Sequence, residues 1–133
     1  MKQEIKKNNV EKNFRITKEH VAKFNSITRD SHPLHKELTF SKSKNFSNIV
    51  INGMFISSLC IGLIMNKMFS KNFILASQKF SYHKPILINT NFKISARILN
   101  FYTRHKFCEV EVKVYCNKIV YCSGNIKISY LKN

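Results

Sequence analysis

The residues best suited to do chemistry lie together in one short polar stretch. Asp30 is the only aspartate among 133 residues, and His32 and His35 follow it closely. A carboxylate and an imidazole on one tight loop can act on a single water molecule, one as a base and the other as an acid. The stretch therefore predicts a site for acid–base catalysis.

Two other interpretations of this stretch stay open. A short polar side chain ahead of Pro33 often caps a turn, and Asp30 also has Arg29 beside it as an ion-pair partner. The spacing D-x-H-x-x-H also suits a metal site, which distant His83 or His105 would have to complete. Because no third histidine or cysteine lies nearby in sequence, we favour the metal-free pair and expect no metal or cofactor.

The element that must position this stretch is the least charged part of the chain, residues 45–66. It is either a membrane span or a helix buried inside a fold. Asn52-Gly53 marks a turn or a helix start, which leaves a helix over about residues 53–69. That helix is roughly 25 Å long, short of the ~30 Å hydrocarbon core of a bilayer. We therefore expect a buried helix and no membrane span.

Alternating apolar and polar residues follow this helix. Before it we expect a short extended segment at residues 11–17 and a helix at residues 18–28, and after it strands at residues 74–83, 91–98, 108–116 and 120–130. Four consecutive strands in an antiparallel meander have one apolar face, which only the central helix is large enough to cover. The predicted fold is α+β, a curved antiparallel sheet wrapped around one buried helix.

Composition adds three expectations. Residues 1–12 are basic with no apolar stretch after them, which predicts a frayed leader before a single domain at residues 13–133.

The net charge of +16 favours phosphate-bearing or acidic partners. The charges are scattered, however, and only four of the basic residues are arginine, so nucleic acid is not expected as a partner. The four cysteines lie among apolar residues without a C-x-x-C pair, as free thiols do in a reducing cytoplasm.

The polar stretch and the helix start together resemble the MaoC-like family of (R)-specific enoyl-CoA hydratases and dehydratases. The family pattern G-D-x-N-P-x-H resembles residues 29–35, RDSHPLH, and the later H-G-M-x-x-x-S resembles residues 52–58, NGMFISS. Residues 78–87 are also similar to a family strand that leads into a proline and a β-branched pair. The resemblance covers most of the chain and implies a hotdog fold.

This resemblance implies that Asp30 and His35 form a catalytic dyad that hydrates enoyl thioesters or dehydrates (R)-3-hydroxyacyl thioesters. The Gly53 N–H at the helix start would bind the thioester oxygen as it gains negative charge. The other implied substrate-site residues are Asn52, His32 and Ser58. The expected partner is an acyl-CoA or acyl-carrier-protein thioester, and the expected assembly is a homodimer.

Four positions depart from the family pattern. Arg29 replaces a glycine, His32 an asparagine and Asn52 a histidine, while Ile61 stands where some hydratases have a serine. Two alternatives therefore stay open: a hotdog thioesterase, which shares the scaffold and the helix-start site, and a non-catalytic protein that binds acyl thioesters or nucleic acid.

Overall fold

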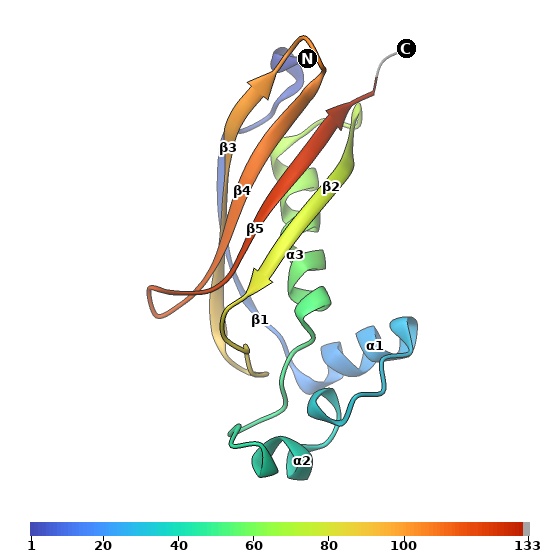
Figure 1. Cartoon of the computed structure of the whole chain (residues 1–133), viewed down its shortest axis with the longest axis vertical. Coiled ribbons are helices and arrows are strands. Elements are labelled where there is room, and N and C mark those ends of the chain that lie inside the picture. The colour runs from blue at the N-terminus through green and yellow to red at the C-terminus, as the bar shows by residue number, and fades with distance from the viewer. Residues whose placement is uncertain (132–133) are drawn as a thin grey trace.

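Helix α3 (Gly53–Met68) packs against one face of a five-stranded antiparallel sheet, as Figure 1 shows. The structure, a computed structural model, describes residues 1–131. The strands, in the sheet order β1-β3-β4-β5-β2, are β1 (Asn9–Arg15), β3 (Asn91–Tyr102), β4 (Phe107–Cys116), β5 (Ile119–Tyr130) and β2 (Phe73–Tyr82). This is the hotdog fold, and the predicted buried helix is confirmed.

The core lies between α3 and the sheet because both present apolar residues at the expected period. Strand β4 alternates strictly, so that every second side chain from Cys108 to Cys116 is buried. Helix α3 buries Ile56, Ser57, Cys60, Leu63, Ile64 and Met68. No helix within residues 1–131 is both long enough and apolar enough to cross a membrane.

Strand β2 does not join the meander, so that part of the prediction was wrong. Strands β3, β4 and β5 are consecutive neighbours, but β2 pairs with β5 at the far edge of the sheet. Residues 83–90 cross from β2 at this edge to β3, which lies next to the other edge strand. Along this connection Ile51 N donates to Ile86 O (2.9 Å), and Asn89 N donates to Ile16 O (2.8 Å). The segment between β2 and β3 therefore passes next to the start of α3.

The prediction of a frayed leader at residues 1–12 was also wrong. Residues from Asn9 onward form β1, which pairs with β3. Helix η1 (Lys2–Glu4) precedes it, and the Glu4 carboxylate accepts hydrogen bonds from Asn72 Nδ2 (2.6 Å), Ser70 Oγ (3.3 Å) and the Tyr130 hydroxyl. These bonds, with that from Tyr130 the largest cause, lower the pKa of Glu4.

The segments between β1 and α3 are short helices. Helix α1 (Lys18–Thr28) was predicted, and it begins where Thr17 Oγ accepts a hydrogen bond from His20 N at 3.3 Å. Helices η2 (Pro33–His35) and α2 (Leu38–Ser43) follow. Together they place the polar stretch next to the start of α3.

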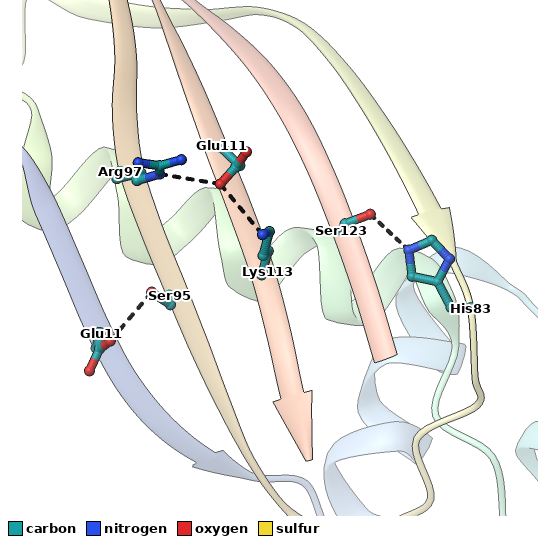
Figure 2. Close-up of polar contacts among 7 residues, drawn as sticks. All are labelled: Glu11, His83, Ser95, Arg97, Glu111, Lys113 and Ser123. Atoms are coloured by element: carbon teal, nitrogen blue, oxygen red, sulfur yellow. Dashed lines mark hydrogen bonds and ion pairs between the residues drawn. The ribbon is translucent and has the colours of Figure 1, made fainter. Parts of the chain in front are cut away.

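The opposite face of the sheet is polar. Figure 2 shows Arg97 and Lys113 beside Glu111, at 3.3 and 3.9 Å, and Ser95 bonded to Glu11 at 3.5 Å. Exposed ion pairs of this kind contribute little to stability. The sheet is therefore one-sided, with its apolar face covered by α3.

Candidate active site

The polar stretch begins where α1 ends in a left-handed residue. Arg29 has φ 60° and ψ 26°, the conformation that favours glycine at a helix end. Arg29, at the position of the glycine in the family pattern, thus has a backbone conformation that glycine adopts without strain. The chain then turns so that Asp30 Oδ1 accepts a hydrogen bond from His32 N at 3.1 Å. Asp30 therefore caps a turn, and its second carboxylate oxygen is left for another partner.

His32 is occupied by the backbone of its own turn. Its Nδ1 accepts a hydrogen bond from Leu34 N at 3.2 Å, and the residue is exposed. It serves as the N-cap of η2, with Pro33 at the first position of that helix. The structure therefore gives His32 a local structural role, and its predicted contact with substrate stays a prediction.

His35 has a defined orientation. Its Nδ1 lies 2.7 Å from the carbonyl oxygen of Val50, which can only accept. Nδ1 therefore carries the proton of the neutral ring, and Nε2 carries a lone pair. An imidazole held in this way is suited to accept a proton from a reacting group.

A cavity of about 410 Å³ lies beside His35. This volume is within the range of small-molecule sites, roughly 300–1,000 Å³. Apolar side chains make up most of its wall, and His83 and Lys84 add positive or polar groups. The other residues that line it are Leu34, Phe46, Val50, Ile51, Gly53, Ile56, Tyr82, Pro85, Ile86 and Cys122.

Asp30 lies in a separate hollow of about 360 Å³ and does not line the cavity beside His35. Its Oδ2 accepts a hydrogen bond from Asn52 Nδ2 at 2.9 Å. The pKa of Asp30 is lowered by the hydrogen bond from His32 N and then by that from Asn52. Asp30 is therefore a carboxylate at neutral pH, connected to the cavity wall through buried Asn52.

The start of α3 supplies free backbone donors. The first bonds of the helix run from Phe55 N and Ile56 N to Asn52 O, at 3.0 and 3.3 Å, so the N–H groups of Gly53 and Met54 precede them. The Asn52 side chain forms no cap. A helix start of this kind stabilises a nearby negative charge. The predicted role of Gly53, binding the thioester oxygen, requires this property.

Tyr82 and Ser57 are site residues that the sequence did not reveal. A Cβ on Gly53 would lie 3.0 Å from the Tyr82 ring, so this glycine makes room for Tyr82. The Tyr82 hydroxyl is hydrogen-bonded to Ser57 Oγ, which also donates to Gly53 O at 3.3 Å. Burial, the largest cause, raises the pKa of Tyr82. Tyr82 lies inside the strand that resembles the family, but nothing in its spacing marks it as a pocket residue.

Ser58 lies apart from these residues. It is exposed, and its hydroxyl donates to Met54 O at 2.8 Å, as helical serines commonly do. Ile61, at the position where some hydratases have a serine, is half-buried against the core. Neither side chain lines the cavity beside His35.

The predicted alternative metal site is not assembled in residues 1–131. No three histidine, cysteine or acidic side chains of that part of the chain lie close enough to hold an ion. His83 Nε2 is hydrogen-bonded to Ser123 Oγ at 2.8 Å, on the polar face of the sheet (Figure 2). His105 lies in the turn between β3 and β4.

Known proteins share both this fold and the sequence pattern. A family model described as a MaoC-like domain matches residues 2–120. The chain belongs to the MaoC-like family. Among curated relatives, the (R)-specific enoyl-CoA hydratase of Aeromonas caviae is 29% identical over 68 residues, which are 51% of this chain and 51% of that protein. The match thus spans about half the length of that relative.

Two solved structures resemble this MaoC-like chain over most of its length. One is the (R)-hydratase from A. caviae involved in PHA biosynthesis, with a TM-score of 0.84 and 18% identity over 96% of each chain. The other is R-hydratase PhaJ1 from Pseudomonas aeruginosa in the unliganded form, with a TM-score of 0.84 and 15% identity over 94% of this chain and 81% of that one. These likenesses show the shared hotdog fold.

Proposed function

We propose that this protein interconverts trans-2-enoyl and (R)-3-hydroxyacyl thioesters, with Asp30 and His35 as the catalytic pair. The observation that carries the proposal is the orientation of His35. Its bond to Val50 O leaves the Nε2 lone pair on a ring that lines the same cavity as Gly53. The name of the A. caviae relative supports this reaction class.

The chemistry follows from the groups at the cavity. In hydration, a water oxygen bonds to Cβ, a base takes the water proton, and the π electrons of the double bond move to Cα and the thioester oxygen. The Gly53 N–H stabilises the negative charge on that oxygen. A proton delivered to Cα from the same side completes syn addition, and dehydration reverses these steps. In this proposal Asp30 and His35 carry out the two proton transfers between them.

Charge near the cavity favours a carrier with phosphates or acidic side chains. Lys84 and His83 line the cavity, and the chain carries a net charge of +16. A positive surface attracts and orients an anionic partner before it binds. We propose acyl-CoA or an acyl-carrier-protein thioester as that partner, and the cytoplasm, where buried cysteines stay reduced, as the compartment.

The exposed edge of the sheet supports a homodimer. Strand β2 is an edge strand of ten residues, and it leaves Ile74 and Tyr82 51% and 47% exposed. A long edge strand with apolar side chains is a template for pairing with another chain. We propose that a second copy covers this edge beside the cavity, and light scattering of the purified protein measures the resulting mass.

The experiment follows the enoyl absorbance of crotonyl-CoA and the release of free thiol in parallel. Loss of absorbance without thiol release supports hydration, whereas thiol release with the double bond intact favours the thioesterase alternative. Asp30→Asn and His35→Ala should each lower kcat by about 10²–10⁴-fold while circular dichroism stays unchanged. Glu19→Gln and His105→Ala, both on the exposed surface, are the matched controls. Full activity in the first two variants contradicts the assigned pair.

The same assay on a panel of acyl lengths, each as CoA and carrier-protein thioesters, identifies the carrier. A binding signal without turnover on every member of the panel would instead indicate a non-catalytic protein.

A further inference from the structure

Two asparagine side chains form a buried pair between α1 and the start of α3. Asn52 Nδ2 donates to Asn25 Oδ1 at 2.8 Å, and the two residues are only 3% and 7% exposed. Burying an amide is unfavourable unless its polar atoms are hydrogen-bonded, so each of these bonds matters for where the side chains lie.

The other bonds of this pair reach both proposed catalytic residues. The Asn52 amide also donates to Asp30 Oδ2 at 2.9 Å. Asn25 Nδ2 donates to the backbone carbonyl of His35 at 3.1 Å. A continuous path of hydrogen bonds therefore runs from the Asp30 carboxylate through two buried amides to the backbone of His35.

The nitrogen and the oxygen of the Asn52 side-chain amide differ in their hydrogen bonding. Its Oδ1 is buried without a partner among the described residues, although both acceptors around its Nδ2 are satisfied. Both hydrogen bonds that this side chain forms within the described residues are therefore donated by its Nδ2. The Asn52 amide nitrogen thus joins the Asp30 carboxylate to Asn25.

The pair also accounts for a departure from the family pattern. Asn52 stands where that pattern has histidine, whose side chain is longer. Asn25 reaches Asn52 from α1 at 2.8 Å, so an imidazole at residue 52 would meet the Asn25 amide. The two asparagines therefore fit each other, and Asn25 does not fit a histidine at residue 52.

We propose that Asn25 is a positioning residue, which holds Asp30 through Asn52 and His35 through its backbone carbonyl, and that the two asparagines together take the place of the histidine in the family pattern. This inference rests on the proposed function, because Asp30 and His35 are the groups that it positions. Asn25 itself touches neither the cavity beside His35 nor, in this proposal, the substrate.

The first test does not depend on activity. Because Asp30 is the only aspartate, ¹³C-labelled aspartate gives a single side-chain carboxyl signal in NMR. Asn25→Ala should shift this signal and raise its titration midpoint, since the Asn52 amide is no longer held against Asp30. Asn66→Ala, an exposed substitution on α3, is the control and should leave the signal unchanged. Asn25→Leu keeps the branched shape of the side chain without its polar atoms and serves if the alanine variant does not fold.

The second test measures turnover of crotonyl-CoA. Asn25→Ala should lower kcat by about 10-fold to 10²-fold with little change in KM, because misplaced catalytic groups slow the chemical step. Asn52→His alone should be at least as slow, whereas Asn25→Ala/Asn52→His should recover kcat, since alanine makes room for the imidazole.

The two tests separate the two proposals. An Asp30 signal and kcat in Asn25→Ala that match those of Asn66→Ala overturn the positioning role. A double variant no faster than Asn52→His overturns the claim that the asparagines replace the histidine together. Absence of turnover in the unmodified protein instead overturns the proposed function, and the NMR titration still decides whether Asn25 positions Asp30.

Discussion

His35 Nδ1 donates a hydrogen bond to the carbonyl oxygen of Val50 at 2.7 Å. Val50 is itself held, because its N–H donates to Leu34 O at 3.0 Å. The backbone next to His35 in sequence thus fixes the acceptor that orients its ring. The hydrogen bond that orients the imidazole ends on a main-chain atom, which no nearby substitution removes directly.

This contact predicts the tautomer of His35. In the neutral protein the proton should reside on Nδ1, and Nε2 should show the ¹⁵N shift of an unprotonated nitrogen. Long-range ¹H–¹⁵N correlation spectra measure both, with His35→Gln to assign the signals. A proton found on Nε2 would contradict the proposed role of that atom as a proton acceptor.

Gly53 and Tyr82 should be energetically coupled. Gly53→Ala places a methyl group 3.0 Å from the Tyr82 ring, which must move away from Ser57. Gly53→Ala should therefore be less favourable in the natural chain than in a Tyr82→Leu background, with a coupling free energy of about 0.5–3 kcal/mol in urea unfolding.

Gly62→Ala is the matched control for this cycle. Apart from the neighbouring residues and backbone of α3, no atom of the described residues lies within 4 Å of a Cβ at Gly62. Alanine there should stabilise the protein by roughly 0.5–1 kcal/mol in both backgrounds. If Gly53→Ala changes the free energy of unfolding equally in the two backgrounds, the Tyr82 ring moves aside without an energetic cost.

Glu4 should stabilise the fold only above acidic pH. Its folded pKa is lowered, chiefly by the Tyr130 hydroxyl, so its contribution is present above the unfolded value of about 4.3 and is lost as pH falls through the folded pKa. Glu4→Gln should lower the free energy of unfolding at neutral pH, and the difference should shrink toward pH ~2. Glu19→Gln, which affects only an exposed pair with Lys23 at 3.5 Å, should show little pH dependence. A constant difference for Glu4→Gln would argue against this role.

The cysteines should resist modification in the folded protein. All four are buried, and burial raises the pKa of Cys122 to about 11 and that of Cys60 further still. Because the thiolate is the reactive form, a disulfide reagent at mildly alkaline pH should label the native protein slowly and all four thiols rapidly in denaturant. Cys122 should react first, since it lines the cavity beside His35. Fast labelling of Cys60 would indicate that the core opens readily.

The elements with strong periodicity could be predicted from the sequence. Helix α3 and strands β3, β4 and β5 have apolar residues that match the burial in the structure. Helix α1 was marked at its start by Thr17. Such signals are local, so they do not depend on knowing which elements are neighbours in the fold.

The position of β2 and the start and pairing of β1 could not be predicted, although an extended segment at residues 11–17 was expected. The order of strands depends on long-range pairing, and the crossing of residues 83–90 has no local signal. Strand β1 is an edge strand with the sequence NVEKNFR, which buries so little that it has no clear alternation. Polar and charged residues at its start therefore looked like a solvated leader.

The candidate site was predictable only where the residues are consecutive. Asp30, His32 and His35 share one loop, and the family pattern drew attention to Asn52 and Gly53. Asn25 looked like an ordinary polar residue of an amphipathic helix, because its partners are 10 and 27 residues away. Buried polar networks of this kind become visible only once helices are packed.

The hydrogen bonds of residues 83–90 have a consequence for how such a protein tolerates substitution. Three segments that surround the cavity are joined by backbone groups: Val50 to Leu34, Ile51 to Ile86, and Ile88 to Ile49. Main-chain hydrogen bonds do not depend on which side chains the residues carry. The surrounding lysines, asparagines and isoleucines can therefore be replaced while these backbone bonds remain. New acyl preferences could be engineered by changing side chains on the cavity wall, with the backbone left as it is.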